Sequence, residues 1–261
     1  MTIEIRNLCF GYPRGGQVLY DINLKFDHPG LVCIIGPNGV GKSTLVKCIN
    51  GIVRPTSGDV LIDGTSTRTM RLKDISRHIG YVPASTADCF SMPVVDAIMV
   101  GRYNHYHIRS SRKDLETVHK AMRVLGIEDL AMRSFNQLSA GQHQKVAIAR
   151  GLVTETEVLI LDEPTSNLDV RHQVYVTELL RAIAEEQDKL IIMICHDLNI
   201  AAKYAHHVVV LEPPGRVYAE GTPKEIFTAE MLRSVYGVDA EIVPDGDIPF
   251  IKLGFATPDK R

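Results

Sequence analysis

The residues best suited to chemistry form a glycine-rich loop between an apolar run and a helical stretch. The apolar run is 31–35, and the helical stretch begins with Lys42, Ser43 and Thr44. This is G-x-x-x-x-G-K-[ST] in the strand–loop–helix setting that a phosphate-binding loop requires. The glycines let backbone N–H groups converge on an anion at a helix N-terminus. Lys42 adds a charge for the terminal phosphates and Ser43 a hydroxyl for Mg²⁺. We therefore predict that the chain binds a nucleoside triphosphate.

Two carboxylates and a histidine follow other apolar runs. Asp162 and Glu163 come directly after residues 158–161, and His196 comes directly after residues 190–195. In folds with a phosphate loop, the chemistry lies at the carboxyl ends of parallel strands. Asp162 would hold Mg²⁺, Glu163 would orient and deprotonate the attacking water, and His196 would contact the γ-phosphate. A solvated strand end would explain one carboxylate more readily than two. We expect Glu163, His196 and Lys42 to be catalytic.

A third element is the sequence Leu138-Ser139-Ala140-Gly141-Gln142. Ser139 has the character of a helix N-cap, with Gln142 at the capping-box position. An ordinary cap is one interpretation. A helix N-terminus with a glycine and a hydroxyl also makes an anion site. Since the chain already has one phosphate loop, a second such site has a purpose if two copies pair head to tail around nucleotide.

Composition limits the remaining function classes. The 261 residues carry a formal net charge of −2, so the overall charge gives no argument for nucleic-acid binding. The five cysteines contain no C-x-x-C pair, and we expect reduced thiols in an intracellular protein. The N-terminus lacks the apolar region of a signal peptide. No apolar run approaches the roughly 18 residues needed to cross a bilayer, so we expect any membrane role to act through a partner.

The hydrophobic pattern predicts an α/β fold with an inserted helical block. Alternation over 2–12 and 18–26 indicates an antiparallel β layer, and 60–62 and 79–82 are expected to form a strand pair. Residues 93–102 and 112–125 have helical spacing. Buried strands over 158–161, 190–195 and 207–211, separated by helices such as 170–186, indicate a mostly parallel sheet covered on both sides.

These elements together resemble an ATP-binding cassette (ABC) ATPase. The phosphate loop at 36–44, the signature at 138–142, the carboxylate strand at 158–164, the segment 166–169 and His196 occur in the family's order. The resemblance implies a P-loop NTPase (RecA-like) core with an antiparallel β layer over 1–83 and 152–243. It also implies a helical subdomain over 84–151, which leaves a C-terminal tail over 244–261. Two subunits would enclose two ATP molecules with Mg²⁺.

The resemblance also implies individual roles. Tyr12 would stack on adenine with Val18 nearby, Ser43 and Asp162 would bind Mg²⁺, and Asp169 would lie at the dimer interface. The signature would contact the partner's nucleotide, with Ala140 in the place where glycine is commonest. The expected nucleotide-binding residues are Tyr12, Val18, Gly36, Pro37, Asn38, Gly39, Val40, Gly41, Lys42, Ser43, Thr44, Ser139, Ala140, Gly141, Gln142 and Asp169.

Two further segments indicate a branch of this family. Residues 221–243 and Val100-Gly101-Arg102 are similar to segments of ATPases that serve iron–siderophore, haem and cobalamin uptake. We therefore expect a homodimer at the cytoplasmic face of the membrane, held there by a polytopic permease. An extracytoplasmic substrate-binding protein would be an indirect partner, and no nucleic acid is expected.

One position departs from the family pattern. After residues 79–83 the family has glutamine, whereas this chain has Ala84, followed by Ser85 and Thr86. Alanine offers no donor or acceptor, so we expect hydrolysis with weakened coupling to Mg²⁺ or to transport. The segment 84–95, with Phe90, Met92 and Pro93, is a candidate docking surface for the permease or an ordinary loop. The alternative function is a non-transport ABC protein that acts as a nucleotide-gated clamp or assembly scaffold.

Overall fold

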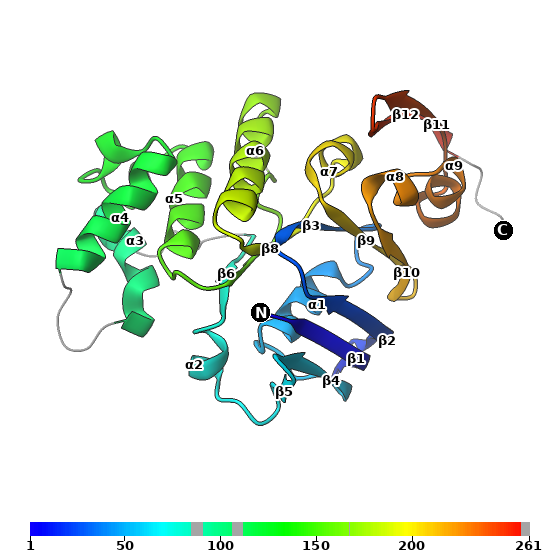
Figure 1. Cartoon of the computed structure of the whole chain (residues 1–261), viewed down its shortest axis with the longest axis horizontal. Coiled ribbons are helices and arrows are strands. Elements are labelled where there is room, and N and C mark those ends of the chain that lie inside the picture. Colours follow the sequence, from blue (N-terminus) through cyan, green and yellow to red (C-terminus); the bar gives the residue numbers. More distant parts are fainter. Residues whose placement is uncertain (85–90, 106–111, 167, 257–261) are drawn as a thin grey trace.

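The computed structural model describes residues 1–84, 91–105, 112–166 and 168–256. An antiparallel sheet lies below a larger sheet, and helices project from the larger sheet (Figure 1). The antiparallel sheet has the strand order β2-β1-β4-β5. Its strands are β1 (Ile3–Tyr12), β2 (Gly16–Phe26), β4 (Ser57–Ile62) and β5 (Thr65–Ser66). Ile3, Ile5 and Leu8 are buried, which confirms the β layer expected from the alternation.

The larger sheet has six strands in the order β10-β9-β3-β8-β7-β6. All neighbouring strands are parallel except β9 and β10. Every residue of β3, β7 and β8 is buried, as expected of strands covered on both faces. The expected mostly parallel sheet is thereby confirmed. The strands are β3 (Gly30–Ile35), β6 (Ile79–Val82), β7 (Val158–Leu161), β8 (Leu190–Ile194), β9 (His207–Glu212) and β10 (Arg216–Gly221).

The expected pairing of residues 60–62 with 79–82 is wrong. β4 pairs with β1 and β5 in the antiparallel sheet, whereas β6 pairs with β7 in the parallel sheet. The segment between β5 and β6, which contains α2 (Leu72–Ile75), carries the chain from one sheet to the other. A short apolar run predicts a buried strand but does not specify its neighbour, because many buried positions satisfy the same pattern.

The two faces of the parallel sheet bury two separate hydrophobic clusters. Val32 of β3 belongs to the cluster formed with α1 (Lys42–Ile49) and the antiparallel sheet. Cys33 belongs to the cluster formed with α6 (Val170–Glu186) and α7 (Leu198–Tyr204) on the other face. This division follows from the two-residue period of a strand. Because β3 is packed on both faces, its position is well defined. The glycine-rich loop that begins at Gly36 therefore has a well-defined position at its N-terminal end.

The helical block lies at one end of the parallel sheet (Figure 1, green). It contains α3 (Val94–Met99), η1 (Val100–His105), α4 (Arg112–Val124), η2 (Glu128–Leu130), η3 (Phe135–Gln137) and α5 (Ala140–Leu152). The described part of the block contains no strand, and its β interaction is the isolated bridge between Pro93 and Ser134. Among the described residues, each helix is shorter or more polar than a bilayer-crossing helix would have to be.

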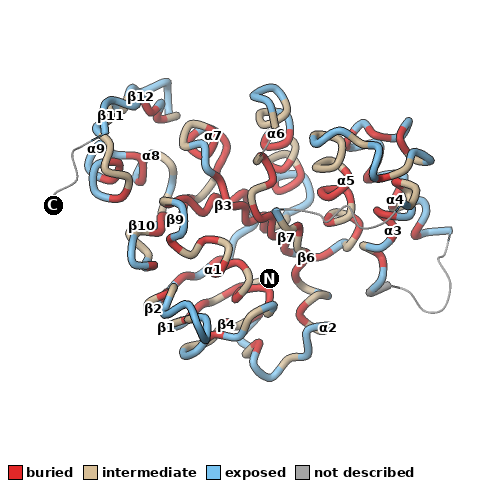
Figure 2. Tube along the Cα trace, turned by 180° about the vertical axis from the view of Figure 1, so that it is seen from behind, coloured by how far each residue is buried: buried red, intermediate tan, exposed pale blue. Residues whose placement is uncertain are grey.

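The described chain ends in a hairpin that the sequence analysis did not anticipate. β11 (Val238–Asp245) and β12 (Ile248–Ala256) pair antiparallel, with Ile242 opposite Ile251. Residues 244–256, within the expected tail, therefore belong mostly to this hairpin. Figure 2 shows the hairpin largely exposed, although Ile251 is only 2% exposed. The chain reaches it through α8 (Pro223–Ile226), α9 (Ala229–Met231) and the single π turn η4 (Leu232–Tyr236).

Candidate functional site

The phosphate loop runs from the end of β3 to the start of α1 and depends on two of its glycines. Gly36 has a φ of 148°, and a Cβ there would lie 2.3 Å from the carbonyl oxygen of Leu211. Gly41 has a φ of 107° and caps α1 without a side-chain hydrogen bond. The helix N-terminus thus retains backbone N–H groups without a side-chain cap. Such groups stabilise an anion.

Lys42 lies folded into this loop. Its Nζ donates hydrogen bonds to the carbonyl oxygens of Gly36, at 2.8 Å, and Pro37, at 2.9 Å. The residue is only 5% exposed. Burial lowers the pKa of Lys42, whereas the carboxylates of Glu163 and Asp162 act in the opposite direction. The lysine charge therefore lies in the loop, near both carboxylates expected from the sequence.

Ser43 and Asp162 meet at the end of β7. The Ser43 hydroxyl donates to Oδ1 of Asp162 at 2.9 Å, and the hydroxyl of Tyr81 donates to Oδ2 at 3.3 Å. Asp162 is 4% exposed. Burial, followed by the Asp162 carboxylate, raises the pKa of Tyr81. A hydroxyl and a carboxylate held together form an oxygen donor set of the kind that binds Mg²⁺ alongside substrate phosphates.

Glu163 and His196 join the ends of β7 and β8. Nε2 of His196 lies 2.8 Å from Oε1 of Glu163. Glu163 adopts a φ of 53°, in the left-handed region that non-glycine residues rarely occupy. Its carbonyl oxygen accepts hydrogen bonds from the backbone N–H and hydroxyl of Ser166, which hold this turn. The two polar strand ends expected from the sequence are thus in direct contact.

Tyr12 and Val18 both lie beside the phosphate loop. The Tyr12 hydroxyl is 3.4 Å from Oγ1 of Thr44, and its ring packs edge-on against Phe10 with 4.8 Å between centroids. A Cβ on Gly41 would lie 3.1 Å from Cγ1 of Val18. Tyr12 remains 41% exposed, so its ring is accessible to a base. The hairpin of β1 and β2 therefore packs against the phosphate loop and the start of α1.

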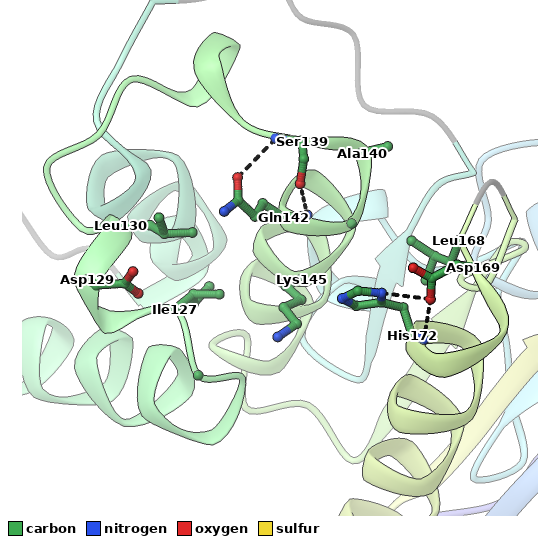
Figure 3. A pocket seen from close by; sticks show the side chains of 12 residues that line it. Ile127, Asp129, Leu130, Ser139, Ala140, Gln142, Lys145, Leu168, Asp169 and His172 are labelled. Carbon is green, nitrogen blue, oxygen red and sulfur yellow. Dashed lines mark hydrogen bonds and ion pairs between the residues drawn. The ribbon is translucent and has the colours of Figure 1, made fainter.

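The signature residues line a separate cavity of about 440 Å³. The expected capping box is confirmed, since Oε1 of Gln142 accepts from the Ser139 backbone N–H and Ser139 Oγ accepts from the Gln142 backbone N–H. Figure 3 shows Gln142, Lys145 and His172 around this cavity. None of the cavity's lining residues comes from 36–44. Within one chain the phosphate loop therefore takes no part in the signature cavity.

Asp169 lies at the edge of the same cavity and caps α6. Its Oδ1 accepts from the backbone N–H of His172 at 2.9 Å and lies 2.8 Å from Nδ1 of the same residue. The backbone hydrogen bond, followed by the ring contact, lowers the pKa of Asp169. His172 was absent from the sequence prediction. Its place three residues after an aspartate that opens a helix was an available signal.

The structure adds two tyrosines near the site. Tyr81 contacts Asp162 as described. The backbone of Gly36 acts on the pKa of the Tyr236 hydroxyl in the direction opposite to the larger effect of burial. Burial raises the pKa of Tyr236. Both residues come from segments whose position relative to the loop depends on the tertiary fold, and nothing in the local sequence marked them.

The segment proposed for docking is described only in part. Ala84, the second residue after β6, is exposed. Ser85, Thr86 and Phe90 lie outside the described residues, as does Asn167 of the segment 166–169. Met92, expected to be exposed, is half-buried against the helical block, and its carbonyl oxygen accepts from the Phe135 backbone N–H at 2.9 Å.

Comparisons with known proteins agree with the motif order. The family model described as ABC transporter matches residues 19–166. The ferric enterobactin transport ATP-binding protein FepC of Escherichia coli is 37% identical over 258 residues, covering 96% of this chain and 94% of FepC. A solved structure described as an inward-facing, metal-chelate type ABC transporter has a TM-score of 0.82 at 26% identity, covering 97% of this chain and 96% of that one.

A second solved structure, described as dimeric, is a bacterial ABC transporter cassette. It has a TM-score of 0.74 at 27% identity and covers 85% of this chain and 98% of that one.

Proposed function

The chain belongs to the ABC transporter family and is an ATPase, and from this premise we propose that it energises an importer of metal chelates. The proposed cargo is an iron–siderophore, haem, cobalamin or related complex. The similarity to FepC over nearly the whole chain supports this class, as do Val100-Gly101-Arg102 and residues 221–243. The chain would act at the cytoplasmic face of the membrane, bound to a polytopic permease that receives cargo from an extracytoplasmic binding protein.

The loop residues 36–44 would hold the phosphates of ATP, with the Lys42 charge on the terminal phosphates. Ser43 and Asp162 fit Mg²⁺, because a hydroxyl and a buried carboxylate already lie 2.9 Å apart. When bound, the ion supplies charge neutralisation at the phosphate oxygens. Glu163 would accept a proton from the attacking water, and His196 would orient Glu163 and contact the γ-phosphate.

The observation that supports a head-to-tail arrangement is that none of the residues lining the signature cavity comes from the phosphate loop of the same chain. A second copy of the chain, placed head to tail, would bring its signature onto the nucleotide held by the first. Gly141 supports this arrangement, since the nearest atoms to a Cβ there would be Leu168 Cδ2 at 3.8 Å and His172 Cδ2 at 3.9 Å. A methyl group at Gly141 would therefore make only ordinary van der Waals contacts, and Gly141 itself lines the signature cavity.

The test is the variant Glu163→Gln. It removes the proposed base and keeps the shape of the side chain, so hydrolysis should fall by about 10²–10⁴-fold while ATP still binds. Incubated with ATP, the variant should accumulate as a dimer, measured by light scattering. A variant that stays monomeric with ATP, even beside its permease, would refute the proposed head-to-tail site.

The second candidate function is a nucleotide-gated clamp or assembly scaffold with slow turnover. The exposed Ala84 favours it, because the family's glutamine at this position supplies polar groups that alanine lacks. Purification from membranes distinguishes the two functions. An importer subunit should copurify with a polytopic protein, whereas a scaffold should not.

A further inference from the structure

The C-terminal hairpin is attached to the parallel-sheet core through the side chain of Asn199. Nδ2 of Asn199 donates to the carbonyl oxygen of Ile251 at 3.1 Å, and the backbone N–H of Ile251 donates to Oδ1 of Asn199 at 2.8 Å. The amide thus makes both hydrogen bonds that a residue of a neighbouring strand would make. In the described chain, β12 has β11 on one edge and no strand on the other.

This pairing is needed because Ile251 is buried. It is 2% exposed, so water cannot readily satisfy its backbone groups. A side chain that replaces Asn199 must both donate and accept in the same plane to keep them paired. Among common side chains of this length, only the asparagine amide carries a donor and an acceptor together. Aspartate accepts from the N–H but cannot donate to the carbonyl oxygen.

Asn199 lies in the first turn of α7, three residues after His196 in the sequence. Oδ1 of Asp197 accepts from the backbone N–H groups of Asn199, at 2.9 Å, and Ile200, at 3.0 Å. The Asp197 carboxylate therefore caps the N-terminus of α7. His196 immediately precedes this cap and reaches Glu163. A shift of the first turn of α7 therefore moves the backbone that carries the His196 ring.

We propose that Asn199 is a positioning residue for His196, and that the hairpin serves as the fixed surface against which it acts. The Asn199–Ile251 pair holds the first turn of α7, and the turn holds the ring of His196 in contact with Glu163. This inference rests on the role proposed for His196.

The test compares ATP hydrolysis by Asn199→Ala, Asn199→Asp and the unmodified chain. A small misplacement of a catalytic group is costly, so kcat of Asn199→Ala should fall by about tenfold or more. The KM for ATP should stay within about twofold, because the phosphate loop is unchanged. Asn199→Asp keeps one of the two hydrogen bonds and should give an intermediate kcat, and it serves as the informative variant if Asn199→Ala does not fold.

Ile62→Val is the matched control for stability. Ile62 of β4 is 3% exposed and belongs to the hydrophobic cluster of the antiparallel sheet, whereas Ile251 and α7 belong to the other cluster. The variant loses one buried methylene, so its thermal midpoint should fall while kcat stays unchanged. If Ile62→Val lowers kcat as much as Asn199→Ala, a general loss of stability explains the effect and the inference is wrong.

A double variant separates the inference from the function on which it rests. His196→Ala alone should lower kcat, and unchanged hydrolysis in that variant would refute the role proposed for His196. If Asn199 acts through His196, adding Asn199→Ala to His196→Ala should change the remaining rate by less than about twofold. A further loss equal to that in the single variant, or a normal kcat in Asn199→Ala and Asn199→Asp, would overturn the inference.

Discussion

The Ser43 hydroxyl and the Asp162 carboxylate lie 2.9 Å apart, although 119 positions separate them in the chain. This bond joins the first turn of α1 to the end of β7. It places a hydroxyl and a carboxylate next to each other beside the phosphate loop. The site is therefore organised by the parallel sheet, and the proposal that Ser43 and Asp162 bind Mg²⁺ rests on this pair of oxygen donors.

Asp162→Asn should selectively weaken Mg²⁺ binding at the site. The amide loses the negative charge that would bind the ion, so the Mg²⁺ concentration for half-maximal hydrolysis should rise by about tenfold or more. A Mg²⁺ titration at saturating ATP measures this. Asp245→Asn, which changes an exposed carboxylate of β11, is the control and should leave the titration unchanged. Equal titrations in both variants would contradict the assigned ligand.

Gly141 should tolerate alanine in the monomer and reject a long side chain in the dimer. The nearest atoms to an added Cβ lie at 3.8 Å and 3.9 Å, so Gly141→Ala should leave stability unchanged or raise it by about 0.5–1 kcal/mol. Gly141→Arg should fold but fill the cavity beside the signature. In the Glu163→Gln background it should abolish ATP-driven dimerisation, measured by light scattering. An arginine variant that still dimerises would argue against a nucleotide at this surface.

Ala84→Gln should strengthen the link between hydrolysis and transport. Ala84 is exposed at the end of β6, next to the strand that carries Asp162. The added amide can donate and accept where alanine cannot. We expect a higher ATPase rate with the permease and a smaller change without it. Unchanged rates in both settings would show that position 84 does not influence coupling.

Arg102 should be among the residues whose loss costs most stability. Arg102 is 2% exposed. Its guanidinium binds Asp114 at 2.9 Å and Glu155 at 2.6 Å, and it also donates to the carbonyl oxygen of Val153. Arg102→Met would remove the buried positive charge that lies between the carboxylates of Asp114 and Glu155, and it should cost about 3–5 kcal/mol in urea unfolding.

Arg71→Met is the matched control for Arg102→Met. Arg71 pairs with Asp74 at 2.8 Å, but its side chain is 82% exposed. Its replacement should change the free energy of unfolding by less than about 1 kcal/mol. Similar losses in the two variants would contradict the importance assigned to burial.

Cys48 should make the fold sensitive to alkali. Burial raises the pKa of its thiol from a reference value of 9.0 to about 12. Between these values the unfolded chain loses the proton and the folded chain keeps it, so stability falls as pH rises. The slope from this residue is about 1.4 kcal/mol per pH unit. Denaturant unfolding from about pH 9 to about pH 11 should give a shallower decline for Cys48→Ala than for the unmodified chain. If stability declines equally with pH in both proteins, Cys48 does not contribute to the sensitivity to alkali.

The sequence predicted well those features that depend on neighbouring residues. The strand, glycine loop and helix start around Lys42 occupy one short stretch, and local φ preferences and apolar burial suffice to form it. The capping box of Ser139 and Gln142 depends on three-residue spacing within one helix turn. The helical character of 93–102 and 112–125 could likewise be predicted from spacing. These features need no knowledge of the remaining chain.

The pairing of strands that lie far apart in the sequence could not be predicted in this way. The assignment of 60–62 and 79–82 to one pair was wrong because a buried strand pattern fits either sheet. The hairpin over 238–256 was missed although Pro249, Ile251, Leu253 and Phe255 occupy alternate positions. Leu253 and Phe255 are exposed in the structure. The alternating pattern therefore did not indicate which part of the protein the hairpin packs against.

By itself, the sequence determined the chemical groups of the site and the local backbone that presents them. Only the tertiary structure decided that Asp162 meets Ser43, that Glu163 meets His196, and that Asn199 completes the edge of β12. The physical reason is that backbone preference and helix capping act over a few residues. The positions of strand ends relative to one another depend instead on how both faces of the parallel sheet are packed.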